Sequence, residues 1–267
     1  MEKKKFIKWI PVVVLVCISI LALVASLVAP HDPYGVDLTK VFMSPSRSYP
    51  LGTDALGRCV FSRLLCGASR SIYSVALVVL ITFVFGSILG IICGYFGGLP
   101  DRIIMRIVDI FLAFPGMVLA IAVAGVLGGG LINAMVAVGA INWTKYTRLA
   151  RGRVMELKKE TFIEATRISG KGNLHIIVHH IIPNVAGYLI VTASSDMGTV
   201  MMEMASLSFL GLSSPLPLPE WGAMISEGKG YLQFAPWLVI APGMAIFLVV
   251  VLFNLTGDTL RDYFQTN

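Results

Sequence analysis

The sequence contains few charged residues. They make up 13% of the 267 positions, where soluble domains commonly have about 25%. Hydrophobic residues make up 56% of the chain, and the mean hydropathy is +0.82. No polar stretch is long enough to form a separate soluble domain, so we expect one membrane-embedded unit that covers residues 1–267.

Cysteines are also few, and their spacing excludes the common cysteine sites. None of the four belongs to a CxxC pair or to a cluster with metal-ligand spacing. Cys59 and Cys66 are seven residues apart, which in a continuous helix separates their Cα atoms by roughly 10 Å, beyond disulfide reach. We therefore predict free thiols at Cys17, Cys59, Cys66 and Cys93.

Enzyme and nucleotide-binding motifs are missing. The sequence has no GxxxxGK[ST] loop and no HExxH pattern, and no Ser/His/Asp arrangement stands out. His175 and His179 could present two imidazoles to a metal, but we favour a structural role. The net charge of +6 is spread between apolar runs, which argues against a nucleic-acid partner. We expect no catalytic, cofactor-binding or metal-binding residues in this chain.

Six apolar stretches are long enough to cross a bilayer. About 20 apolar residues span the hydrocarbon core, where a helix pairs all of its own backbone groups. The first stretch follows a basic head but is too long for a signal-peptide core, so we expect it to be retained. The predicted fold is an all-α membrane protein, with spans at about 10–29, 71–96, 103–127, 131–150, 184–205 and 236–254 and an ordered outer segment at 30–70.

The distribution of Lys and Arg predicts the orientation. With a cytoplasmic N-terminus, fourteen basic residues flank the spans on the cytoplasmic side and six on the other side, with Lys145 near a helix end. Both termini should therefore be cytoplasmic. In the outer segment we expect local pairing of basic residues with Asp32, Asp37 and Asp54.

Two features inside the spans predict helix packing or function. Gly86, Gly90 and Gly94 form a small-residue stripe, for which we favour close packing against another helix. Asp196 lies mid-span, where a carboxylate is costly. We expect it either to line a translocation pathway or to pair with another helix. Asp109 and Glu203 lie closer to span ends, where solvent lowers the cost.

Residues 151–183, the coupling segment, form the longest predicted cytoplasmic connection. Periodic apolar positions predict two short helices separated by Gly170 and Gly172, which can end a helix sharply. Pro183 should set the start of the next span.

The coupling segment resembles the cytoplasmic motif of ABC importer permeases, which reads Glu-Ala-Ala, three residues, Gly, nine residues, Ile-x-Leu-Pro. Here the matching residues are Glu164, Ala165, Thr166, Gly170 and then His180 to Pro183, with the spacing preserved. Thr166, His180 and Ile182 depart from the motif. The ending His-Ile-Ile-Pro-Asn is similar to that of the dipeptide, oligopeptide and nickel branch.

Further stretches, in the same order and spacing, are similar to that branch and together cover most of the chain. They are 51–58, 62–63, 109–115, 206–212, 221–222 and 254–258. Cys59 replaces an acidic residue of the pattern, which leaves any ion pair of that residue in doubt.

The resemblance implies a permease subunit in the bacterial cytoplasmic membrane that forms half of a translocation pathway. Its implied partners are a second, homologous permease, two ATP-binding subunits that hold ATP and magnesium, and an extracytoplasmic substrate-binding protein. Glu164, Ala165, Thr166, Gly170 and Pro183 would couple the permease to the ATPases. Di- or oligopeptides are the first substrate candidates and nickel or metal chelates the alternative. The rival from another class is an ion-driven secondary transporter.

Overall fold

The chain is helical throughout the part that the computed structural model describes, residues 9–213 and 217–266. Within these residues extended backbone pairs only in an isolated bridge between Thr53 and Cys59. The helices are α2 (Ile10–Val28), η1 (Leu38–Lys40), α3 (Val60–Phe96), α4 (Gly98–Leu112), α5 (Gly116–Val126), α6 (Leu131–Leu157), α7 (Thr161–Ile168), α8 (Asn173–Ile176), η2 (Ile177–Ile181), α9 (Ile182–Phe209), α10 (Trp221–Gly228), η3 (Lys229–Tyr231) and α11 (Trp237–Thr266).

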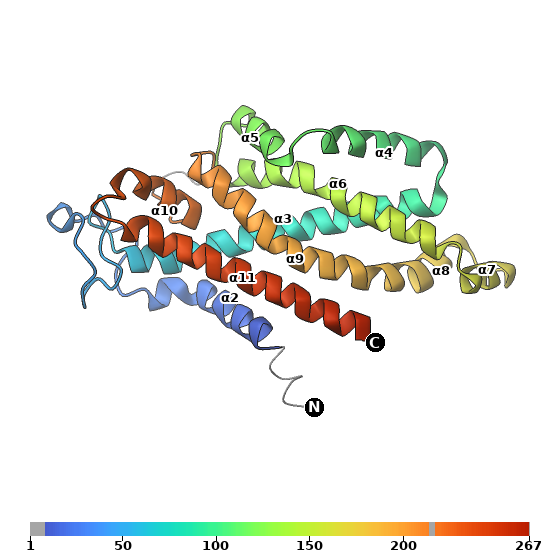
Figure 1. Ribbon diagram of the computed structural model, residues 1–267, viewed down its shortest axis with the longest axis horizontal. Helices are drawn as coiled ribbons and strands as arrows, with labels where there is room; N and C mark the ends of the chain where they lie inside the picture. Colours follow the sequence, from blue (N-terminus) through green and yellow to red (C-terminus); the bar gives the residue numbers. More distant parts are fainter. Residues whose placement is uncertain (1–8, 214–216, 267) are drawn as a thin grey trace.

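The long helices lie side by side along one axis of an elongated bundle (Figure 1). The segment between α2 and α3 lies at one end together with α10, and we call this the outer end. The helices α7 and α8 form the opposite, inner end. In Figure 1, the start of α2 and the end of α11 are the ends of these helices that point toward the inner end. This arrangement agrees with an even number of crossings between the two termini.

Four of the described helices are long and apolar enough to cross a membrane, and the bent pair of α4 and α5 raises the number to five. These four are α2, α3, the continuous run Asn173–Phe209 and α11. The remaining expected span corresponds to α6, which lies alongside α3 but contains several charged residues. The expectation of six spans therefore stays a prediction.

The third expected span, 103–127, was wrong as a single straight helix. α4 and α5 meet at an angle of 91° across a short break that ends at Pro115. Proline lacks an N–H group and disfavours helical backbone at the preceding residue, here Phe114. The helix therefore ends before Pro115 and restarts in a new direction.

Three helices are longer than the hydropathy predicted. α3 begins at Val60 instead of residue 71, α6 continues to Leu157, and α11 continues to Thr266. The added turns are rich in polar residues, so mean hydropathy does not identify them as part of a span. Tertiary packing nevertheless stabilises these turns as helix. One consequence is that Lys145 lies in the middle of α6 and not near its end.

The glycine stripe of α3 brings this helix into close contact with α6. A Cβ atom added at Gly86 would lie 2.4 Å from the carbonyl oxygen of Trp143, and one at Gly90 would lie 2.4 Å from that of Thr147. Since real Cβ atoms do not approach this closely, only glycine permits the contact. The predicted packing role of the stripe is confirmed, and these helices form the centre of the bundle.

Two apolar clusters stabilise the bundle. The larger one joins α3, α6, α9 and α11 and includes Val75, Ala137 and Leu207, all fully buried. The smaller one lies at the inner end, where Tyr95 and Val154 meet residues of the coupling segment. The inner end therefore has an apolar cluster that is separate from the larger one.

Candidate functional site

The motif residues Glu164, Ala165 and Thr166 lie together on α7 at the inner end. Glu164 and Ala165 are exposed, and Thr166 is half-buried with its hydroxyl donating to the carbonyl oxygen of Phe162 at 2.7 Å. Glu164 lies in the first turn of the helix, where a negative charge interacts favourably with the helix dipole.

Gly170 ends this helix as expected. Its φ angle is +78°, a left-handed conformation that glycine adopts without steric cost, and its N–H donates to the carbonyl oxygen of Arg167 at 3.0 Å. The chain then turns and begins α8 after Gly172.

Pro183 lies in the first turn of α9, where we expected the next span to begin, but no break separates this helix from α8. The helix runs without interruption from Asn173 through Pro183 to Phe209. A π-helical turn at 177–181 precedes the proline. Such a turn changes the backbone hydrogen-bond register, which lets the helix continue past a residue that has no N–H group. Pro183 is exposed and lies apart from the α7 motif, in a groove of about 610 Å³ that Arg153, Tyr188 and Arg261 also line.

The coupling segment is held firmly against the bundle. Ile163 of α7 is fully buried in the inner apolar cluster. The hydroxyl of Tyr95, at the end of α3, donates to the side chain of Asn173 at 2.9 Å. Lys158 donates to the carbonyl oxygen of Tyr95 at 2.6 Å. A displacement of α7 would therefore be passed to α3 and α6.

The same segment leaves large apolar side chains uncovered. Ile168 is 87% exposed and Leu174 is 75% exposed. Together with Phe162 and Val178 they form what we call the apolar crest. These residues belong to the part of the chain that the sequence predicts to be a water-facing connection, so lipid does not explain their exposure.

Asp196 lies in the middle of α9 and is paired with another helix. Its Oδ1 atom accepts a hydrogen bond from the ammonium group of Lys145 on α6. The carboxylate is nearly buried, whereas the side chain of Lys145 is 45% exposed. The helix-pairing expectation for Asp196 is confirmed, and the partner is a residue that the sequence analysis placed at a helix end.

Asp196 also belongs to a row of polar residues along α9. The row has alternating spacings of four and three residues, which places all members on one face of the helix. Glu203, in the same row, accepts a hydrogen bond from Asn142 of α6 at 2.9 Å. We call this row the polar stripe; its members are Thr192, Asp196, Thr199, Glu203 and Ser206.

Two further ion pairs join α4 to α6. Asp101 accepts two hydrogen bonds from the guanidinium group of Arg151, at 2.5 and 2.8 Å. Asp109, which we expected near the cytoplasmic end of its span, pairs with Arg148 in an exposed position. Both pairs lie toward the inner half of the bundle and attach the broken helix to α6.

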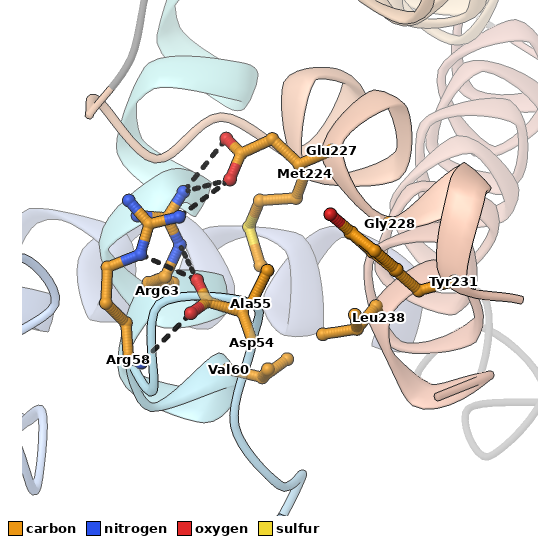
Figure 2. Close-up of a pocket in the computed structure, with 10 residues that line it drawn as sticks. All are labelled: Asp54, Ala55, Arg58, Val60, Arg63, Met224, Glu227, Gly228, Tyr231 and Leu238. Carbon is orange, nitrogen blue, oxygen red and sulfur yellow. Dashed lines mark hydrogen bonds and ion pairs between the residues drawn. The ribbon is translucent and has the colours of Figure 1, made fainter. Parts of the chain in front are cut away.

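A buried group of ion pairs connects the segments of the outer end (Figure 2). Asp54 accepts from the Nε atom of Arg58 at 2.6 Å, and Glu227 of α10 accepts from Arg58 at 2.8 Å and from Arg63 at 3.1 Å. Both arginines are almost completely buried. We call these four residues the outer ion cluster. Its two positive and two negative charges balance, so no buried charge is left unpaired.

The local pairing predicted for the outer segment is confirmed for Asp54 and for Asp37, which pairs with Lys40 at 2.8 Å. Because Lys40 and Thr39 both donate to its carboxylate, the pKa of Asp37 is lowered to about 2. Asp32 instead accepts from the backbone N–H of Tyr34 at 2.9 Å. Cys59 is buried beside the outer ion cluster without belonging to it.

Sequence reasoning missed the polar stripe, its contacts with Asn142 and Lys145, and the role of Glu227. The alternating spacing of polar residues within the fifth apolar run could have revealed the stripe. Nothing in the sequence pairs Glu227 with Arg63, because 164 residues separate them.

A comparison with known families gives a match over residues 86–267 to the model described as binding-protein-dependent transport system inner membrane component. The chain belongs to this family. It is therefore a multi-pass inner-membrane permease component of an ABC importer.

Individual relatives of this permease cover nearly its whole length. It is 39% identical to the dipeptide transport system permease protein DppC of Alkalihalophilus pseudofirmus, over 97% of this chain and 86% of the relative. It is 41% identical to the probable D,D-dipeptide transport system permease protein DdpC of Escherichia coli, over 94% and 84%. Identity to the nickel transport system permease protein NikC of Escherichia coli is 38%, over 96% and 94%.

A solved structure with the same fold is the inward-facing MetNI methionine ABC transporter. The TM-score is 0.60 at 20% sequence identity, and the match covers 74% of this permease and 95% of the solved chain. At this identity the likeness shows the fold alone, an all-helical transporter permease.

Proposed function

We propose that this permease forms half of the translocation pathway of an importer for short peptides and that α7 and α8 couple it to ATP hydrolysis. In this proposal its partners are a second, homologous permease, two ATP-binding subunits that carry ATP and magnesium, and an extracytoplasmic substrate-binding protein. The permease itself binds no cofactor. The family match supports partners of these kinds.

The observation that carries the coupling role is the exposed apolar crest on a firmly held segment. Ile168 and Leu174 are available to a partner surface, while Ile163 and Asn173 attach the same segment to the bundle. An amphipathic helix that presents apolar side chains in this way can dock into a groove of a partner. Glu164 would meet basic groups of that groove, and Gly170 would hold the turn between the two helices.

The proposed topology places the inner end in the cytoplasm, with both termini on that side and six spans in all. The excess of Lys and Arg on this side supports the orientation. The sixth span is α6, which lies beside α3 and whose charged residues pair with α4 and α9 instead of facing lipid. The bent pair of α4 and α5 counts as one span.

For the substrate, the names of the relatives support two candidates. Two of them are named for dipeptides or D,D-dipeptides and one for nickel. We take short peptides as the first candidate and nickel or a metal chelate as the second. Vanadate-sensitive uptake of a labelled peptide, compared with labelled nickel, in vesicles that contain the complete transporter decides between them. Uptake that follows an ion gradient without ATP would refute both.

The coupling role is tested with Glu164→Gln and Gly170→Val in the reconstituted transporter. Glu164→Gln should reduce peptide uptake per ATP hydrolysed by about tenfold, the equivalent of one lost charge-assisted contact. Gly170→Val should also reduce it, because valine disfavours the φ angle of +78° at this turn. Glu156→Gln is the matched control, since Glu156 is an exposed carboxylate on α6 outside the motif. Normal uptake by both motif variants would refute the assignment, provided that the purified complexes contain the usual subunits.

A further inference from the structure

The Lys145–Asp196 pair lies near the middle of two neighbouring long helices, α6 and α9. Asp196 is near the middle of α9, roughly 20 Å from either end at 1.5 Å per residue. Lys145 occupies the middle of α6, and almost half of its side chain is exposed. An ammonium group at this depth is too costly to face acyl chains, so its exposed side must meet water or protein.

The surroundings of the pair favour water. The polar stripe of α9 continues on both sides of Asp196, with Thr192 half-buried on one side and Thr199 exposed on the other. A transmembrane helix with one polar face over about four turns is what a water-filled pathway requires. Because Lys145 and Asn142 of α6 contact this face, a pathway along it would have the pair at its edge.

The pair also has unused hydrogen-bonding capacity. Asp196 is 8% exposed, yet its Oδ2 atom is buried without a partner among the described residues. The hydroxyl of Tyr146, buried next to Asp196, interacts with this carboxylate but makes no hydrogen bond of normal geometry. Buried polar atoms are normally satisfied, since leaving them unpaired costs free energy. An incoming hydrogen-bond donor would satisfy the carboxylate.

We propose that Lys145 and Asp196 form a binding site for the charged ends of a peptide zwitterion in transit. Asp196 takes the peptide ammonium group and Lys145 takes the peptide carboxylate. This inference rests on the proposed function and adds the chemical basis on which the permease itself recognises its substrate.

Charge balance explains why the ligand is a zwitterion. In the empty site Lys145 and Asp196 neutralise each other. When a zwitterion enters, each exchanges its partner for a group of the same charge on the ligand, so no ion is left unpaired in the low-dielectric interior. A lone cation would leave the Lys145 ammonium unpaired beside it, and a lone anion would do the same to Asp196.

The test uses the complete transporter in nanodiscs, with a reporter at an exposed position of the polar stripe. Thr199→Cys should react with a positively charged, water-soluble thiol reagent, and the parent protein provides the background. Trialanine should slow the labelling of the variant by about tenfold. N-acetyl-trialanine amide, which lacks both charges, should give no protection.

Removal of either half of the site should abolish the protection. In the Thr199→Cys background, Asp196→Asn and Lys145→Met should each bring labelling in the presence of trialanine back to the unprotected rate. Lys145→Met is the safer variant for folding, since the position is half-exposed. The control is Asp109→Asn, which breaks an exposed ion pair to Arg148, one turn away on α6, and should keep the protection.

Three results would overturn the inference: no labelling at Thr199→Cys, no protection by trialanine, or protection that survives in both site variants. The proposed function is tested separately by ATP-dependent peptide uptake in the unmodified transporter. Uptake without protection refutes only the binding site. Absence of ATP-dependent uptake of any peptide refutes the proposed function.

Discussion

The outer and inner ends of this permease are stabilised in opposite ways. At the outer end, four charged side chains from three segments are paired in the outer ion cluster, and three of them are buried. At the inner end, α7 buries Ile163 and exposes its other large apolar side chains. The outer end pairs its charges within one chain, whereas the inner end leaves large apolar side chains exposed.

This difference bears on how a transporter subunit can move. A cluster of buried, mutually paired charges resists rearrangement, because separating any pair leaves an uncompensated ion. Apolar contacts with a partner have no such directional requirement and can be maintained while the partner moves. We therefore expect the outer end to resist rearrangement more strongly than the inner end.

The largest expected effect on stability comes from breaking the outer ion cluster. Arg63→Met leaves the carboxylates of Asp54 and Glu227 with one arginine, and should lower the free energy of unfolding by about 3–5 kcal/mol. Thermal unfolding of the purified protein measures the loss. Arg47→Met, at an exposed position of the same segment, should change stability by less than about 0.5 kcal/mol. Equal effects of the two changes would show that the outer ion cluster has no stabilising role.

An intermediate effect is expected at the helix contact that connects the two ends. Gly90→Ala places a methyl group 2.4 Å from the Thr147 carbonyl oxygen and should destabilise the protein by about 1–3 kcal/mol as α3 and α6 separate. Gly152→Ala is the matched control, because its added methyl group meets no atom within 4 Å. It should be neutral or slightly stabilising. The melting temperatures of the two variants decide the point, and a stable Gly90→Ala would contradict the close packing.

The smallest effect on stability is expected at the apolar crest. Ile168→Ser removes a side chain that is 87% exposed and should change the free energy of unfolding by less than about 0.5 kcal/mol. Uptake per ATP should nevertheless fall, because the change weakens the proposed contact with the ATPase. Ile163→Ser, at the buried position of the same helix, should lower the melting temperature instead. A variant at Ile168 that is stable and fully coupled would remove the apolar crest from the docking surface.

Much of the helical framework could be predicted from the sequence because local composition determines which stretches form membrane helices. The apolar run at 10–29 became α2, and Gly170 ended α7 as its backbone freedom predicted. The prediction failed where one residue or a distant partner decides the structure. Pro115 divided the third helix, and Pro183 was accommodated within a continuous one.

Local sequence is enough to establish an all-helical membrane protein with an exposed segment that contains Gly170 and Gly172, since hydropathy and backbone freedom are properties of neighbouring residues. Which charges meet depends instead on how the helices pack. Lys145 pairs with Asp196, which is 51 positions away in the sequence, and Arg63 pairs with Glu227, which is 164 positions away. A charge inside a membrane protein must be paired, but the partner is chosen by which helices pack together.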